Sequence, residues 1–306
     1  MERRRVVRTA VRLAAFLLLI AGSIPVLRSI QVARAGTALT PGNIVVYRVG
    51  TGGAGTTLVN SGNPVFLDEY TPAGSLVQSI ALPTSASGAN HRLIASGTAT
   101  SEGLLTRSTD GQYLLVTGYD AEIPTASLAG TSSATTPRVV GRIDGNSNVD
   151  TTTALTDFAS ANNPRGVAST NGSDIWVGGA AGGVRYTTLG STTSTQLSTT
   201  VTNIRSVEIF NDQLYNSDSS GSLVRIGTVG VGLPTTAGQT ITNLPGFPAT
   251  TGSPYAFFSP IWMPVCPVSI PYTSPMMAWA SRNILWYPEA GLPMGLSVLQ
   301  RICTAA

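Results

Sequence analysis

The stretch LLTRSTDGQYLLV, residues 104–116, carries the pattern that decides the fold. Two apolar segments flank a polar turn built on Asp110-Gly111. An Asx-Gly pair supplies the positive φ angle, or the side chain that caps its own turn, that a tight hairpin needs. The same pattern occurs at residues 166–177, around Asn171-Gly172, and at residues 205–215, around Asn211-Asp212. The sequence therefore predicts three β-hairpins.

A second short motif of strand type follows each hairpin, at residues 137–143, 183–186 and 222–226. Val184 and Val224 are 40 residues apart, as are Asn171 and Asn211. One four-stranded blade of a β-propeller needs about 40 residues. The spacing indicates a repeated unit of four strands.

The rest of residues 36–258 also reads as short β-branched or aromatic segments between polar clusters. Residues 43–49 and 175–177 have strand length, and residues 66–70 and 76–80 flank the turn at Pro72-Ala73-Gly74. No segment keeps apolar residues at helical spacing with caps at both ends. We therefore predict an all-β chain.

Ser108–Val116 has the form Ser-x-Asp-Gly-x-x-Leu-x-Val, which resembles the inner strands of secreted bacterial β-propellers of the kelch/WD-like type. The resemblance covers about residues 40–258 and implies a β-propeller of four-stranded blades. About four to five blades fit into this length, fewer than in the commonest rings, so we expect an incomplete propeller. An irregular β-sandwich and a β-solenoid remain as alternatives, although a solenoid would repeat at shorter periods.

Residues 1–35 have the order of a secretory signal peptide. An Arg-rich start precedes an apolar run over residues 13–27, and Ala33 and Ala35 occupy the small-residue positions before a cleavage site between Ala35 and Gly36. The alternative is an uncleaved anchor, but the run is short for a membrane span. We expect a secreted or periplasmic protein with no membrane attachment after cleavage.

The positive net charge of +3 belongs to this N-terminal segment. The chain has 18 Arg and no Lys, and seven of the Arg lie in residues 1–35, which leaves 11 Arg against 14 acidic residues. Without a basic stripe there is no surface to neutralise a phosphate backbone. We therefore expect no nucleic-acid partner.

The composition changes at residue 259. Residues 259–306 hold both Cys, four of the five Met, three of the four Trp and seven of the 19 Pro, with only two Gly. The apolar residues there follow neither strand alternation nor a helical stripe. They read as an atypical tail, either a genuine Pro-rich hydrophobic extension or the product of a shifted reading frame.

The genetic code favours the shifted frame. Met and Trp each have one codon, so the neighbouring frame is partly fixed: Trp262-Met263 and Met276-Met277 give Asp, and Met294-Gly295 gives Gly. These are residue types of the preceding strands and turns. We hypothesise that a single-base deletion near Phe257-Phe258 truncated a longer propeller.

Few residues suggest catalysis or metal binding. His91 is the only histidine, which excludes multi-His metal sites and leaves one base for a Ser-His-Asp triad, but no Gly-x-Ser-x-Gly nucleophile motif is present. We expect His91 to be a non-catalytic loop residue. Trp176 and Tyr186 can form a stacking platform for a ligand, but we favour a place in the core.

The loop from Asp144 to Asp150 resembles a calcium-binding loop. Asp144, Asn146, Asn148 and Asp150 offer oxygen ligands at alternating positions, but no bidentate Glu follows, so an ordinary polar hairpin loop is the preferred interpretation. Asp110, Asp144, Asp174 and Asp212 all lie at turns, where Asx side chains cap backbone amides.

The sequence thus predicts a secreted binding or interaction module with no cofactor and no catalysis of its own. Its partner would be an unknown extracellular protein or glycan. Two alternatives are a fragment of an extracytoplasmic enzyme acting on a polysaccharide or peptide, and a truncated product without function.

Overall fold

The computed structural model describes residues 36–52, 57–218, 225–247, 252 and 254–257, and the backbone of residues 284–286. The predicted signal peptide and most of the tail beyond residue 258 lie outside the described residues. Within the described part, no helix has the length and apolar character needed to cross a bilayer.

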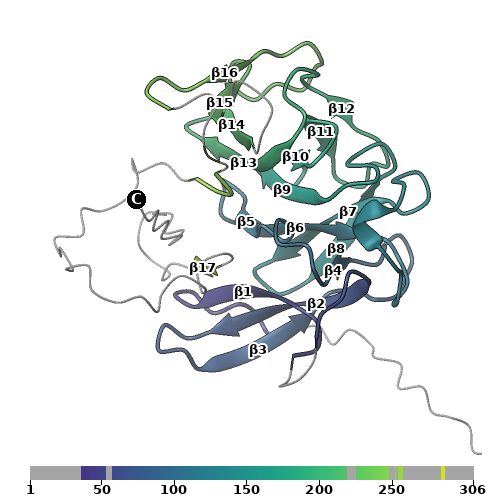
Figure 1. Cartoon of the computed structure of the whole chain (residues 1–306). Helices are drawn as coiled ribbons and strands as arrows, with labels where there is room; N and C mark the ends of the chain where they lie inside the picture. The colour runs from purple at the N-terminus through teal and green to yellow at the C-terminus, as the bar shows by residue number, and fades with distance from the viewer. Residues whose placement is uncertain are drawn as a thin grey trace, which may run out of the picture. The chain divides into compact units, whose positions relative to one another are not determined.

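The described residues form three antiparallel β-sheets and no α-helix, with one 3-10 turn, η1, at Leu128–Gly130 (Figure 1). The all-β prediction is therefore confirmed. None of the three sheets closes on itself.

The first sheet has nine strands, and its main path runs β17-β1-β2-β4-β6-β7-β8, with β3 paired to β2 and β5 paired to β6. Its strands are β1 (Ile44–Val49), β2 (Gly62–Tyr70), β3 (Leu76–Ala81), β4 (Ile94–Ser96), β5 (Thr106–Arg107), β6 (Tyr113–Tyr119), β7 (Arg138–Asp144), β8 (Val149–Leu155) and β17 (Ile284–Trp286).

The other two sheets have four strands each, and in both the neighbours in space are neighbours in sequence. The second sheet contains β9 (Pro164–Ser169), β10 (Asp174–Gly179), β11 (Val184–Thr188) and β12 (Thr195–Gln196). The third contains β13 (Ile204–Phe210), β14 (Gln213–Asp218), β15 (Ile226–Val229) and β16 (Ile241–Asn243).

The three stretches with an Asx turn form the antiparallel pairs β5–β6, β9–β10 and β13–β14. Gly111 and Gly172 have φ angles of 74° and 76°, and Asn211 and Asp212 have φ angles of 48° and 56°. The positive φ angles expected from the sequence are present at all three turns, and they allow each chain to reverse within a few residues.

The short motifs that follow the first two hairpins form a third strand beside each hairpin. Residues 137–143 fall on β7 and residues 183–186 on β11, each hydrogen-bonded to the second strand of its hairpin. Residues 222–224 lie outside the described residues, and β15 begins just after them at Ile226.

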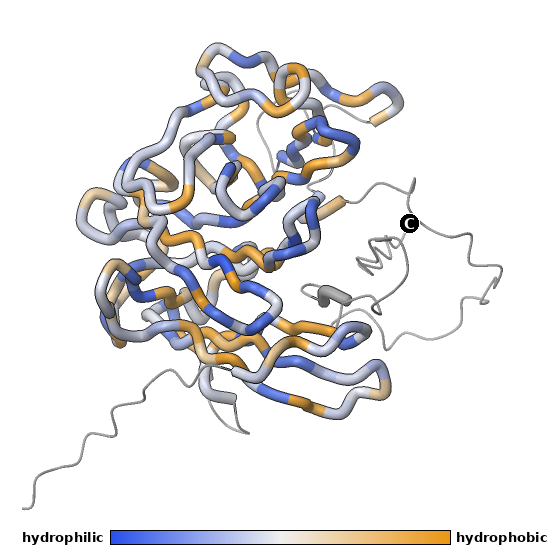
Figure 2. Tube along the Cα trace, turned by 180° about the vertical axis from the view of Figure 1, so that it is seen from behind, coloured by the Kyte–Doolittle hydropathy of each residue, from blue (hydrophilic) through white to orange (hydrophobic). Residues whose placement is uncertain are grey.

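Apolar layers separate successive groups of strands. One cluster joins β1–β3 to β6 and β7 and includes Leu67 and Val139. A second joins β6–β8 to β9 and β10, and a third joins the second sheet to the third through residues such as Trp176 and Val207. β9 lies between β6 and β13 (Figure 1). Hydrophobic stretches of the chain are interrupted by hydrophilic ones along the whole trace (Figure 2).

Two long segments rich in Ser, Thr, Ala and Gly, residues 121–137 and 189–202, read in the sequence as surface loops with little to bury, but both contain buried residues. Leu128 in η1 is 0% exposed and packs on Tyr119. Leu197 and Val201 are buried in the layer between the second and third sheets. A few apolar residues therefore anchor each loop.

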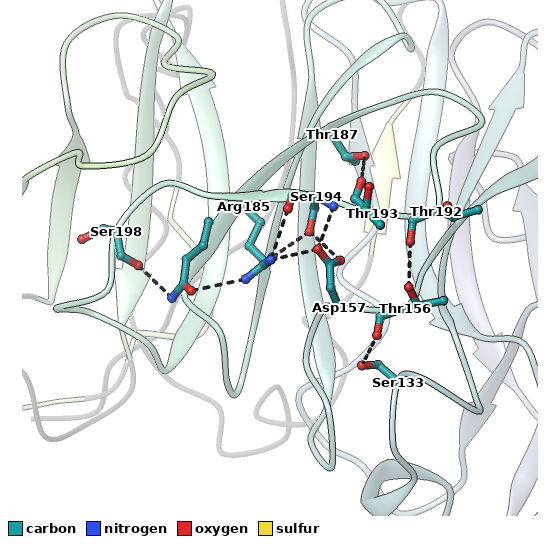
Figure 3. Close-up of polar contacts among 10 residues, drawn as sticks. Ser133, Thr156, Asp157, Arg185, Thr187, Thr192, Thr193, Ser194 and Ser198 are labelled. Carbon is teal, nitrogen blue, oxygen red and sulfur yellow. Dashed lines mark hydrogen bonds and ion pairs between the residues drawn. The ribbon is translucent and has the colours of Figure 1, made fainter.

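The loop at residues 189–202 also joins the first sheet to the second through polar contacts (Figure 3). The Thr156 N–H donates to the carbonyl of Thr192 at 2.9 Å, which covers the outer edge of β8. The Asp157 carboxylate accepts hydrogen bonds from Ser194 and forms an ion pair with Arg185 at 3.0 Å. Covering an edge strand in this way keeps it from pairing with another chain.

Asn216 on β14 is buried in a position that its amide does not fit. It is 0% exposed, its strand neighbour across the sheet is Val207 of the apolar layer, and neither amide atom has a hydrogen-bond partner. An unsatisfied buried amide costs about 1–3 kcal/mol. We expect Asn216→Leu, which keeps the branched shape but replaces the amide by two methyl groups, to raise the free energy of unfolding by about 1–3 kcal/mol, measured by urea denaturation. A lower midpoint for Asn216→Leu than for the unchanged chain would contradict this.

Candidate functional site

A polar depression of about 330 Å³ lies at the β7–β8 turn end of the first sheet. Tyr113 begins β6, and the strand register places Arg142 on β7 directly opposite Asp150 on β8. Three adjacent strands thus bring these side chains to one end of the sheet. The lining residues are Asn90, Tyr113, Arg142, Asp144, Asn148, Val149, Asp150 and Thr152.

Asp144 shapes the turn beside the depression. Its Oδ1 accepts hydrogen bonds from the backbone N–H groups of Asn146 and Asn148, both at 2.9 Å, and its Oδ2 accepts one from the Asn148 side chain. Burial alone would raise the pKa of Asp144, but the hydrogen bonds from Asn148 and Asn146 outweigh it and lower that pKa. Asp144 is therefore a carboxylate at neutral pH and holds the turn rigid.

Arg142 forms the opposite wall of the depression. Its guanidinium lies 4.7 Å from the centre of the Tyr113 ring and forms an ion pair with Asp150 at 2.9 Å. The other carboxylate oxygen of Asp150 accepts hydrogen bonds from the backbone and hydroxyl of Thr152. The cation, the ring and the carboxylate are therefore fixed relative to one another.

Of the four residues of the calcium hypothesis, Asp144, Asn148 and Asp150 line the depression and Asn146 does not. The carboxylates are already occupied by backbone amides, a hydroxyl and Arg142. No group of three or more His, Cys, Asp or Glu side chains within the described residues is placed to hold a metal ion. These contacts are those of a polar hairpin loop, and the calcium site stays a prediction.

The other turn acids differ in role. Asp110 caps its turn, because its Oδ1 accepts the Gln112 N–H at 3.0 Å. Asp174 instead accepts hydrogen bonds from the Tyr186 hydroxyl and the Asn171 side chain, and it is Asn171 that caps the backbone there. Within the described part of the chain, the Asp212 side chain forms no hydrogen bond. Asp212 contributes to its turn through its positive φ angle instead.

His91 lies next to the depression and is paired with an acid that sequence reasoning missed. Its Nδ1 is 2.8 Å from Asp120 Oδ2, and Arg92 bonds the other oxygen of Asp120 at 3.1 Å. Within residues 57–218 and 225–247, no Ser or Thr hydroxyl is hydrogen-bonded to the second ring nitrogen of His91. A His–Asp hydrogen bond is one part of a Ser-His-Asp triad, but no nucleophile accompanies it within these residues.

Trp176 occupies the core position that we favoured. It is 2% exposed, and its Nε1 donates to the carbonyl of Pro234 at 2.8 Å. Tyr186 is half-buried with its ring centre 5.3 Å from that of Trp176. Neither residue lines the depression.

A second polar group, which the sequence did not reveal, surrounds the buried carboxyl of Glu102. Glu102 is 8% exposed and accepts hydrogen bonds from the Tyr119 hydroxyl, the Asn163 side chain and the Ser96 N–H. Burial raises the pKa of Glu102 in spite of these bonds and of the nearby charge of Arg138. Its partners come from separate elements, so only the fold brings them together.

These residues define an all-β chain with a polar depression at one sheet end and a buried polar group between its sheets. A scan of family models found none that matches the chain, and a search of curated proteins also found no match.

Proposed function

We propose that residues 36–258 are consecutive blades of an incomplete, secreted β-propeller that acts as a binding module without catalysis of its own. Two features support this proposal: each four-stranded sheet follows the order of the chain, and an apolar layer lies between successive groups of strands. An irregular β-sandwich would not require strands to follow one another in this way.

The depression beside Arg142 carries the functional part of the proposal, and its ligand is a glycan. Sugars offer hydroxyl groups that both donate and accept hydrogen bonds. A charged planar group, such as a guanidinium or a carboxylate, can form two parallel hydrogen bonds with a pair of neighbouring hydroxyls. The depression presents the Arg142 guanidinium, the Asp150 carboxylate and the Asn90 amide, with the Tyr113 ring and Val149 as apolar contacts. Ligand sites typically combine a few fixed polar groups with apolar contacts.

A glycan array probed with the purified secreted chain tests this proposal, followed by calorimetry with the oligosaccharide that binds. We expect Arg142→Gln to weaken binding about 10- to 150-fold, because a lost charged hydrogen bond costs about 1.5–3 kcal/mol. Arg185→Gln is the matched control, since Arg185 forms a similar ion pair with Asp157 away from the depression. Equal losses in both variants, or an array without a bound glycan, would contradict the proposal.

We also propose that the chain is the truncated product of a longer propeller, with the frame shifted near Phe257-Phe258. The described residues before that point support blade structure up to the break, because Phe257 packs on Phe210 of β13 with ring centres 6.0 Å apart. Resequencing the DNA through codons 257–306 tests this directly. A second frame that continues with Asx-Gly hairpins is expected, whereas a clean read with only the present frame open would overturn it.

The second candidate is a fragment of an extracytoplasmic enzyme that acts on a polysaccharide or peptide, and the change of composition at residue 259 is the observation that favours it. In that case the catalytic part would lie downstream of the frame break. A restored frame that runs into a catalytic domain would support the enzyme, and one that continues into plain blades would support the binding module.

A further inference from the structure

Two Asn-x-Arg segments begin the strands that lie side by side between the second and third sheets. Asn163-Pro164-Arg165 leads into β9 and Asn203-Ile204-Arg205 into β13, and the two segments are 40 residues apart. β9 and β13 are in contact, so equivalent positions of the two segments meet. Two guanidinium groups are therefore brought to the same end of neighbouring strands.

Arg165 is buried but has no acidic partner. It is 8% exposed, its Nε donates to Ser101 Oγ at 3.0 Å, and one amino group donates to Asn203 Oδ1 at 2.7 Å and to the carbonyl of Ile204 at 3.0 Å. These acceptors are all neutral. Burial, and then the nearby positive charge of Arg205, lower the pKa of Arg165 to about 10.

Arg205 is less well satisfied. Its guanidinium carbon lies 4.2 Å from the centre of the Tyr255 ring, and its Nε is buried without a hydrogen-bond partner. Neither Arg205 nor Arg165 forms an ion pair with any acidic residue of the described part of the chain. A buried guanidinium N–H without an acceptor is unfavourable, and a second cation beside it adds repulsion.

The carboxylate of Glu102 cannot serve both groups. Glu102 acts on Arg165 electrostatically, but its two oxygens already accept hydrogen bonds from Tyr119, Asn163 and the Ser96 N–H. The site therefore has an excess of positive charge and of hydrogen-bond donors. An external anion would supply what is missing.

We propose that Arg165 and Arg205 form a binding site for a ligand carboxylate, separate from the glycan depression. Arg205 is only partly buried, so its amino groups, together with the second amino group of Arg165, can donate hydrogen bonds to the two oxygens of a carboxylate. The Tyr255 ring holds Arg205 in place by covering one face of its guanidinium.

Calorimetric titration of the full secreted chain with sodium D-glucuronate tests the site, with D-glucose as the uncharged analogue and inorganic phosphate as the alternative anion. We expect saturable glucuronate binding that weakens with added salt, and no glucose binding. Phosphate that binds more tightly than glucuronate would overturn the carboxylate assignment.

Glucuronate binding by single-residue variants then shows where the anion binds. We expect Arg205→Gln to weaken glucuronate binding at least tenfold, Arg205→Lys to weaken it less, and Arg185→Gln to leave it unchanged. The unfolding midpoint of Arg205→Gln without ligand is expected to be no lower than that of the unchanged chain, because the change removes an unpaired charge. Unchanged binding in Arg205→Gln, or loss of binding in Arg142→Gln instead, would overturn the proposal. The second outcome would place the carboxylate in the glycan depression.

Discussion

Replacing Arg138 by methionine should lower the free energy of unfolding by about 3–5 kcal/mol. Arg138 is 1% exposed on β7, and its guanidinium donates hydrogen bonds to four backbone carbonyls and one hydroxyl of the loops on either side. These acceptors are the carbonyls of Thr131, Thr136, Ala159 and Asn162 and the hydroxyl of Thr131. Methionine fills similar space but leaves these acceptors without a donor.

Thermal unfolding of the purified variant measures this effect, with an expected drop in the midpoint of about 10 °C. The unfolding midpoint of Arg138→Lys should lie between those of Arg138→Met and the unchanged chain, because one ammonium cannot reach acceptors on both loops. Arg92→Gln is the control, since the Arg92 side chain is 27% exposed and one of its two acidic partners, Glu122, is 81% exposed. A midpoint for Arg138→Met within 2 °C of the unchanged chain would show that the loops do not depend on Arg138.

The hairpins were predictable because the information for a tight turn is local. Asp110-Gly111 and Asn171-Gly172 specify positive φ angles within four residues of chain, and the flanking apolar runs specify the strands. The pairing of β9 with β10 then follows without any knowledge of distant residues. Turn chemistry of this kind is readable from a single sequence.

The loop between β11 and β13 was misread because its composition conceals its anchors. Eleven of its residues from 189 to 202 are Ser, Thr, Gly or Gln, and Leu197 and Val201 are its buried apolar side chains. So few apolar residues in a polar run give no periodic signal. Their burial depends on where the second and third sheets meet, which the sequence alone does not specify.

The polar groups around Glu102 and Arg165 were missed for a related reason. Glu102 bonds Asn163 across 61 positions of the chain, and Arg165 bonds Asn203 across 38. The one available signal was the Asn-x-Arg spacing of 40 residues, which matches the spacing of the turns. A search for repeats among the strand starts, as well as among the turns, would have found it.

The contact between the second and third sheets depends on Gly166 of β9, and Gly166→Ala should cost about 3 kcal/mol. A Cβ atom at this position would lie 2.9 Å from the backbone nitrogen of Val207 and 3.0 Å from the Cα of Ser206. Both atoms belong to the backbone of β13, so no flexible side chain can move aside. The sheets would have to separate, which would loosen the apolar layer between them.

Gly130→Ala provides the matched control for this prediction. A Cβ atom at Gly130 meets nothing within 4 Å, and neither Gly130 nor Gly166 has a positive φ angle, so backbone strain is absent from both substitutions. Urea denaturation should therefore separate them, with Gly130→Ala within about 0.5 kcal/mol of the unchanged chain. Because Gly166 contacts β13 and Arg165 is its neighbour, Gly166→Ala should also weaken glucuronate binding. If Gly166→Ala were as stable as Gly130→Ala, β9 and β13 would not be packed as closely as the structure places them.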